Sequence, residues 1–91
     1  MSTQQTIETR LTERFSPVHL EIVDDSARHA GHPGAAGGGG HFLVTLVSAD
    51  FEGMPRVQRH RAVYQELDGL MGGAIHALGL KTWTPAEWES R

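Results

Sequence analysis

An apolar run at residues 41–48, followed by a helical pattern and then by a second apolar run at residues 74–80, constrains the fold more than any other feature. The first run is rich in branched and aromatic residues and is typical of a β-strand. The second is near-continuous, as in a parallel strand that other elements cover. A strand, a helix and a strand in this order make a crossover connection. We therefore expect the two strands to lie parallel, with right-handed connectivity.

The helical pattern between the two strands predicts a helix over residues 55–70. Pro55 can occupy its first position, and Gly72 and Gly73 stop it. One stripe of this helix is expected to carry the residues that recur at helical spacing: Val57, His60, Tyr64, Leu67 and Met71. His60 on this stripe is expected to pack or to form a hydrogen bond within the domain.

The remaining elements follow from caps and from a change of period. Residues 3–15 are predicted to form an amphipathic helix that begins with a capping box, and residues 18–23 alternate as a half-buried strand does. A second capping box starts a short helix that carries Trp88. The prediction is an α+β fold of helix-strand-strand-helix-strand-helix order. Its three-stranded mixed sheet pairs strand 18–23 antiparallel with strand 41–48 and has the helices packed on one face.

The length of 91 residues leaves room for a single domain, residues 1–91. Residues 24–40 contain six glycines and no periodicity, so we expect a flexible glycine-rich loop between the first two strands. Residues 1–6 are polar and no window approaches 18 apolar residues, which predicts neither a signal peptide nor a membrane span. The expectation is a soluble, cytoplasmic protein.

Composition excludes several kinds of chemistry. The chain has no cysteine, so it can form no disulfide and no thiolate nucleophile, and it cannot build a zinc or iron–sulfur site from its own thiolates. It also lacks a nucleotide-binding glycine signature and a convincing acid–base pair, so we expect no enzymatic activity. The net charge of −3 argues against strong non-specific attraction to nucleic acid.

His76 interrupts the second apolar run and is the first candidate functional residue. Imidazole is the commonest metal ligand and titrates near neutral pH. A histidine in such a run can instead belong to the core, with its ring nitrogens hydrogen-bonded to the backbone. The residues alone leave both interpretations open.

Several motifs, taken together in their order and spacing, resemble the BolA family, whose fold is like a class II KH domain. The matching segments are residues 25–29, 41–42, 47–48, 51–53, 59–64 and 75–78. This resemblance implies partnership with monothiol glutaredoxins, ligation of a shared [2Fe–2S] cluster, and a role in iron–sulfur trafficking or iron regulation. In some bacterial members it implies transcriptional regulation.

The resemblance also implies which residues hold the cluster. The family's ligand in the His-Ala-Leu motif falls on His76, and its loop ligand falls on His29, with His32 as an alternative to His29. The cluster would be shared with a glutaredoxin and glutathione, and the isolated apo protein would hold none. The spacing of His29, His32 and His41 resembles that of a zinc site, but histidines in such a loop are usually solvated, and we expect no structural zinc. The family usually has Ser where this chain has Gly79.

A DNA-binding transcriptional regulator is the alternative function. Arg56, Arg59 and Arg61 would give one helix a positive patch, and KH-like folds can bind nucleic acid. The Gly-x-x-Gly loop that KH domains carry between helices is missing. Sequence leaves open whether the apo protein forms a homodimer.

Overall fold

The protein is described by a computed structural model that covers residues 2–25 and 40–91. Within these residues the elements are α1 (Thr3–Phe15), β1 (His19–Asp24), β2 (Gly40–Val47), the 3₁₀ helix η3 (Ala49–Phe51), α2 (Arg56–Glu66), β3 (Ile75–Trp83) and α3 (Pro85–Ser90). This order confirms the predicted α+β fold. The predicted loop 24–40 falls largely on residues 26–39, which lie outside the described residues.

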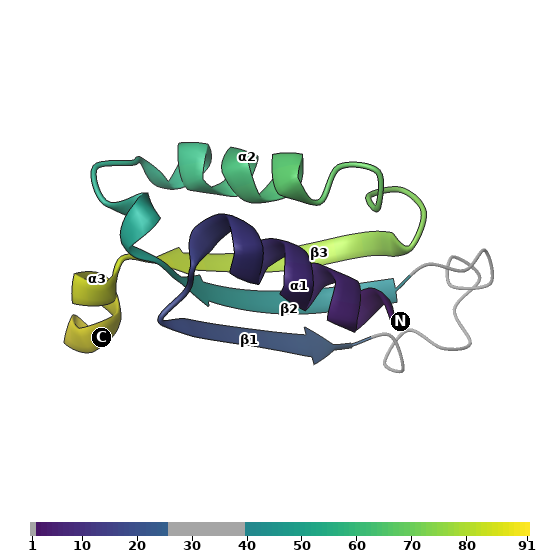
Figure 1. Ribbon diagram of the computed structural model, residues 1–91, viewed down its shortest axis with the longest axis horizontal. Coiled ribbons are helices and arrows are strands. Elements are labelled where there is room, and N and C mark those ends of the chain that lie inside the picture. The colour runs from purple at the N-terminus through teal and green to yellow at the C-terminus, as the bar shows by residue number, and fades with distance from the viewer. Residues whose placement is uncertain (1, 26–39) are drawn as a thin grey trace.

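The strands form one mixed sheet in the order β1-β2-β3. β1 pairs antiparallel with β2, and β2 pairs parallel with β3, as the crossover pattern predicts. Helices α1 and α2 lie on the same face of this sheet, while α3 lies at the end of the sheet where β3 stops (Figure 1). The opposite face of the sheet, which we call the open face, is not covered by α1 or α2.

The hydrophobic core fills the space between the helix layer and the sheet. Helix α1 contributes the predicted stripe, because its apolar residues recur every four positions and all point to the sheet. Its capping box is present at Ser2 and Gln5, as predicted. The buried core consists of Ile7, Leu11, Phe15, Phe42, Val44, Leu46, Phe51, Val63, Leu67 and Ile75.

Helix α2 differs from the prediction in both length and orientation. It ends at Glu66 rather than at residue 70, and Gly69 adopts a positive φ of 90° that a helix cannot continue through. The predicted stripe is wrong at Val57 and Tyr64, whose exposed fractions are 64% and 38%. The buried residues of this helix are Arg59 and Val63, in line with the buried Leu67 that follows.

Arg59 can lie on the buried side of α2 because Glu87 of α3 neutralises it. Its Nη1 and Nη2 donate to the two carboxylate oxygens at 2.7 and 3.3 Å, and its Nε donates to the Met54 carbonyl at 2.8 Å. The hydrogen bond from Arg59, with the backbone N–H of Thr84, lowers the pKa of Glu87 from an ordinary 4.5 to about 2. Glu87 is also the third residue of the predicted α3 capping box, which is present.

Ser48 joins three elements where β2 ends. Its side chain is fully buried, with 0% exposure. The Ser48 Oγ donates a 2.6 Å hydrogen bond to the carbonyl of Phe15, the last residue of α1, and accepts a 3.1 Å hydrogen bond from the Asp50 N–H in η3.

No helix among the described residues is long and apolar enough to cross a membrane.

Candidate functional site

Side chains on the open face form rows across the sheet, because paired residues of neighbouring strands point to the same side. The pairing of β2 with both neighbours defines these rows. From the end where β2 begins they are the histidine row (His41, Ala77), the apolar row (Val23, Leu43, Gly79), the charged row (Glu21, Thr45, Lys81) and the tryptophan row (His19, Val47, Trp83).

His76 joins the histidine row through an irregularity in the pairing of β2 with β3. Gly40 pairs with Ile75, but the next residue, His41, pairs with Ala77, so His76 is the extra residue of a β-bulge. The His76 side chain is exposed, and its ring lies 5.1 Å from the ring of His41, between centroids. The interpretation of His76 as a core histidine is therefore wrong, and the two imidazoles lie side by side at one end of the sheet.

This histidine pair is not a metal site by itself. Among residues 2–25 and 40–91, no group of three or more histidine, cysteine or acidic side chains is arranged to hold a metal ion. Both imidazoles are nitrogen donors when neutral, so the described residues offer two donors and no thiolate. A cluster or ion bound here would need its remaining ligands from elsewhere.

The predicted loop ligands cannot be placed in this site. His29 and His32 lie outside the described residues, so their role stays a prediction. His41 is the neighbour of His76 that the motifs did not single out as a ligand. His41 and His76 each lie near the start of a strand, and the two strands were predicted to pair in parallel, which could have indicated that the histidines are neighbours. The distance between their rings, however, depends on the bulge.

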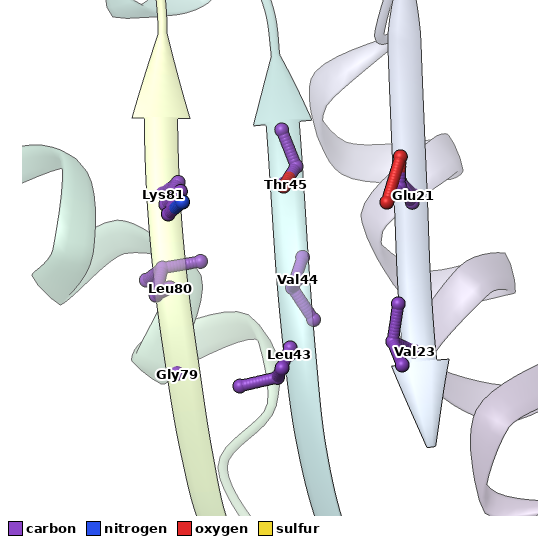
Figure 2. Close-up of a pocket in the computed structure, with 8 residues that line it drawn as sticks. All are labelled: Glu21, Val23, Leu43, Val44, Thr45, Gly79, Leu80 and Lys81. Carbon is purple, nitrogen blue, oxygen red and sulfur yellow. The ribbon is translucent and has the colours of Figure 1, made fainter. Parts of the chain in front are cut away.

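The apolar and charged rows border a depression of about 270 Å³ on the open face. Figure 2 shows Val23, Leu43 and Gly79 in line across the three strands, with Glu21, Thr45 and Lys81 in line beside them. The Leu43 side chain extends toward Gly79 in this view. Val23 on the edge strand β1 and Leu43 on the central strand β2 are 42% and 46% exposed, so both present apolar surface to solvent.

Helix α3 closes the far end of the open face over the tryptophan row. The Trp88 ring stacks on His19 at 4.8 Å and meets Trp83 edge-on at 5.7 Å, between centroids. Val47, between them in the row, is consequently buried at 0% exposure. The contact of His19 with α3 joins residues 69 positions apart, and no pattern in the sequence indicates it.

The predicted arginine patch is only partly at the surface. Arg56 and Arg61 are exposed, but Arg59 is 6% exposed and bound to Glu87, so the prediction that Arg59 contacts nucleic acid is wrong. The reason is that the buried face of α2 includes position 59. A second depression, of about 260 Å³, lies between α2 and β3 and is bordered by Arg56, His60 and Lys81.

The chain is a small α+β domain in which an exposed His76 lies beside a half-buried His41. The chain matches the family model described as BolA-like protein over residues 11–87, and it belongs to this family. It is 40% identical over 91 residues to the DNA-binding transcriptional regulator BolA of Haemophilus influenzae, covering 100% of this chain and 85% of that protein. Two solved structures from Arabidopsis thaliana are similar: BolA1, with a TM-score of 0.84 at 39% identity, and the BolA domain of SufE1, with 0.82 at 37%. Each covers 96% of both chains.

Proposed function

We propose that this protein is a non-enzymatic adaptor that binds a monothiol glutaredoxin and holds a [2Fe–2S] cluster jointly with it, for iron–sulfur trafficking or iron regulation. The observation that carries this proposal is the exposed His76 beside His41, at the end of an open sheet face, in a chain without cysteine. Membership of the BolA-like family supports it.

The donor set fits a shared cluster better than one held by this chain alone. Iron–sulfur clusters are held mainly by thiolates, and histidine can replace cysteine on one iron. The described residues supply two imidazoles at this site and no group of three donors. A glutaredoxin cysteine and glutathione would supply the thiolates that this chain lacks.

His76 is the first ligand in this proposal because it is exposed and anchored on β3. The second ligand is His29 or His41. His29 is the residue that the family resemblance indicates, while His41 is the one whose ring lies 5.1 Å from His76. In the second case both donors come from adjacent strands, so little conformational entropy is lost when the cluster binds.

DNA binding is the second candidate function. The similar protein of Haemophilus influenzae is named a DNA-binding transcriptional regulator. Arg56, Arg61 and Lys81 are the exposed cations near α2 that could contact phosphates. Such binding should weaken steeply between low and physiological salt, whereas a complex that depends on coordination should not.

The test is an anaerobic titration of a cluster-loaded monothiol glutaredoxin with glutathione, followed by visible absorption and circular dichroism. The wild-type chain should convert the glutaredoxin spectrum into that of a distinct heterodimer, and His76→Ala should not. His41→Ala and His29→Ala identify the second ligand, since only the variant that lacks it should alter the final spectrum. His60→Ala, on the helix layer, is the matched control.

A wild-type chain that leaves the glutaredoxin spectrum unchanged would overturn the cluster proposal. Retention of the heterodimer spectrum by His76→Ala would overturn the ligand assignment. In either case, salt-dependent DNA binding that Arg56→Ala and Lys81→Ala weaken would favour the second candidate function.

A further inference from the structure

We propose that the apolar row and the charged row of the open face form the docking surface for the thiolate-bearing protein that completes the site at His76. This inference rests on the proposed function, since it places the same partner. It assigns a role to the depression in Figure 2, which the histidine pair itself does not use.

Position on the sheet is the first argument. Leu43 lies two residues after His41 on β2 and on the same face, so the apolar row begins about 7 Å from the histidine row. A protein that brings a cysteine thiolate to a cluster at His76 and His41 is far wider than this distance. The partner must therefore either lie over the neighbouring rows of the open face or extend past the end of the sheet into solvent.

Exposed apolar surface decides between these two directions. Val23 and Leu43 are 42% and 46% exposed, although both lie within strands. At the far end of the same face, Val47 is buried because Trp88 and its neighbours cover the tryptophan row. Among the described residues, α3 covers one end of the open face and no helix covers the apolar row, so the adjacent Val23 and Leu43 offer apolar surface for a contact.

Gly79 gives the apolar row its shape. A Cβ atom at position 79 would lie 2.7 Å from Cδ2 of Leu43, closer than such atoms can approach. The glycine therefore leaves room for the Leu43 side chain to extend toward β3, as Figure 2 shows. Leu43 and Gly79 together line part of the depression.

The charged row provides orientation. Glu21 is on β1 and Lys81 on β3, so the two outer strands carry opposite charges on either side of Thr45. A partner with a cation over β1 and an anion over β3 is favoured, and the reversed orientation places like charges together. The docked partner then presents its thiolates to the histidine row in one orientation only.

The same anaerobic titration tests this surface when the measured quantity is the concentration of chain at half conversion. Leu43→Lys should raise that concentration at least about tenfold, because an anchor in the centre of an interface is lost, while leaving the final spectrum unchanged. Gly79→Ala should raise it by a smaller factor, since it only displaces Leu43. Val57→Lys is the matched control, because Val57 is an apolar residue on α2 that is 64% exposed, more than Leu43. It should change the midpoint less than twofold.

These results separate the two proposals. His76→Ala is expected to change the spectrum itself, whereas Leu43→Lys changes only the midpoint. If Leu43→Lys and Gly79→Ala both reach half conversion at the same concentration as wild type, the docking surface is overturned and the cluster proposal stands. If wild type forms no mixed cluster, amide shifts on adding apo glutaredoxin decide: shifts at Val23, Leu43 and Gly79 support this surface, and shifts confined to α2 overturn it. A wild-type homodimer that Leu43→Lys dissociates, with no glutaredoxin bound, would assign the face to a second copy instead.

Discussion

Replacing Ser48 with alanine should destabilise the fold more than the loss of one oxygen atom suggests. The Oγ atom is buried and bonded to both the Phe15 carbonyl and the Asp50 N–H. Phe15 is the last residue of α1, so its carbonyl has no acceptor role within the helix and depends on Ser48. Alanine keeps the shape of the side chain, which leaves hydrogen bonding as the main change.

The expected loss can be estimated from these two bonds. A buried acceptor left without its donor costs roughly 1–3 kcal/mol, and the lost cap of η3 adds about 1 kcal/mol. The sum, about 2–4 kcal/mol, is a large part of the roughly 5–15 kcal/mol that stabilises a typical domain. For a chain of this size it corresponds to a decrease in Tm of roughly 10–30 °C.

Urea unfolding followed by circular dichroism measures the free energy difference directly. Ser90→Ala is the control, because Ser90 is exposed at the end of α3. A Ser48→Ala variant within about 0.5 kcal/mol of wild type would show that the junction of α1, β2 and η3 does not depend on this hydroxyl.

Two further predictions concern Glu87 and the turn before β3. Glu87→Gln keeps the capping box but removes the charge that faces Arg59, so it should be less stable than wild type at neutral pH. Because folding lowers the pKa of Glu87 from 4.5 to about 2, this difference should be complete above pH 4.5 and disappear as the pH falls through about 2. A pH-independent difference in urea titrations would contradict the assigned ion pair. Gly72 has a φ of 82°, so Gly72→Ala should cost about 1–2 kcal/mol, while Gly73→Ala should change stability by less than about 0.5 kcal/mol. Equal effects of the two substitutions in the same titrations would refute the role of the positive φ.

Local signals were sufficient to predict most of the fold. Helix α1 and helix α3 each begin with a capping box, which depends on residues three positions apart and can be read directly. The crossover from β2 to β3 also follows from the order of elements alone. In each case, the residues that determine the structure are close in sequence or act through a general rule of chain connection.

The orientation of α2 could not be predicted in this way. Periodicity places a charged residue on the solvent side, so position 59 was assigned to the surface. Its burial depends on Glu87, 28 residues further along the chain, which neutralises the guanidinium. An ion pair between distant segments leaves no periodic signal, and it reversed the prediction for both Arg59 and Val57.

The candidate site was predicted in part. His76 was identified because it breaks an apolar pattern, and that reasoning needs no tertiary structure. Its neighbour His41 depends on the register of two strands separated by a helix, including a bulge that no pattern in the sequence indicates. The extent of the open face likewise depends on which rows α3 covers.

Because His76 is the extra residue of a β-bulge, neither the strand pairing nor the apolar pattern of β3 depends on it. Ile75 and Leu78 both belong to the core side although they are three positions apart, an odd spacing that a regular strand cannot place on one face. A strand without residue 76 would pair continuously and keep the same apolar residues facing the helices. His76 is thus an added residue in β3 and does not take the place of a residue that pairs or packs in that strand. Such a sheet could gain or lose this histidine in a single evolutionary step without redesigning its core.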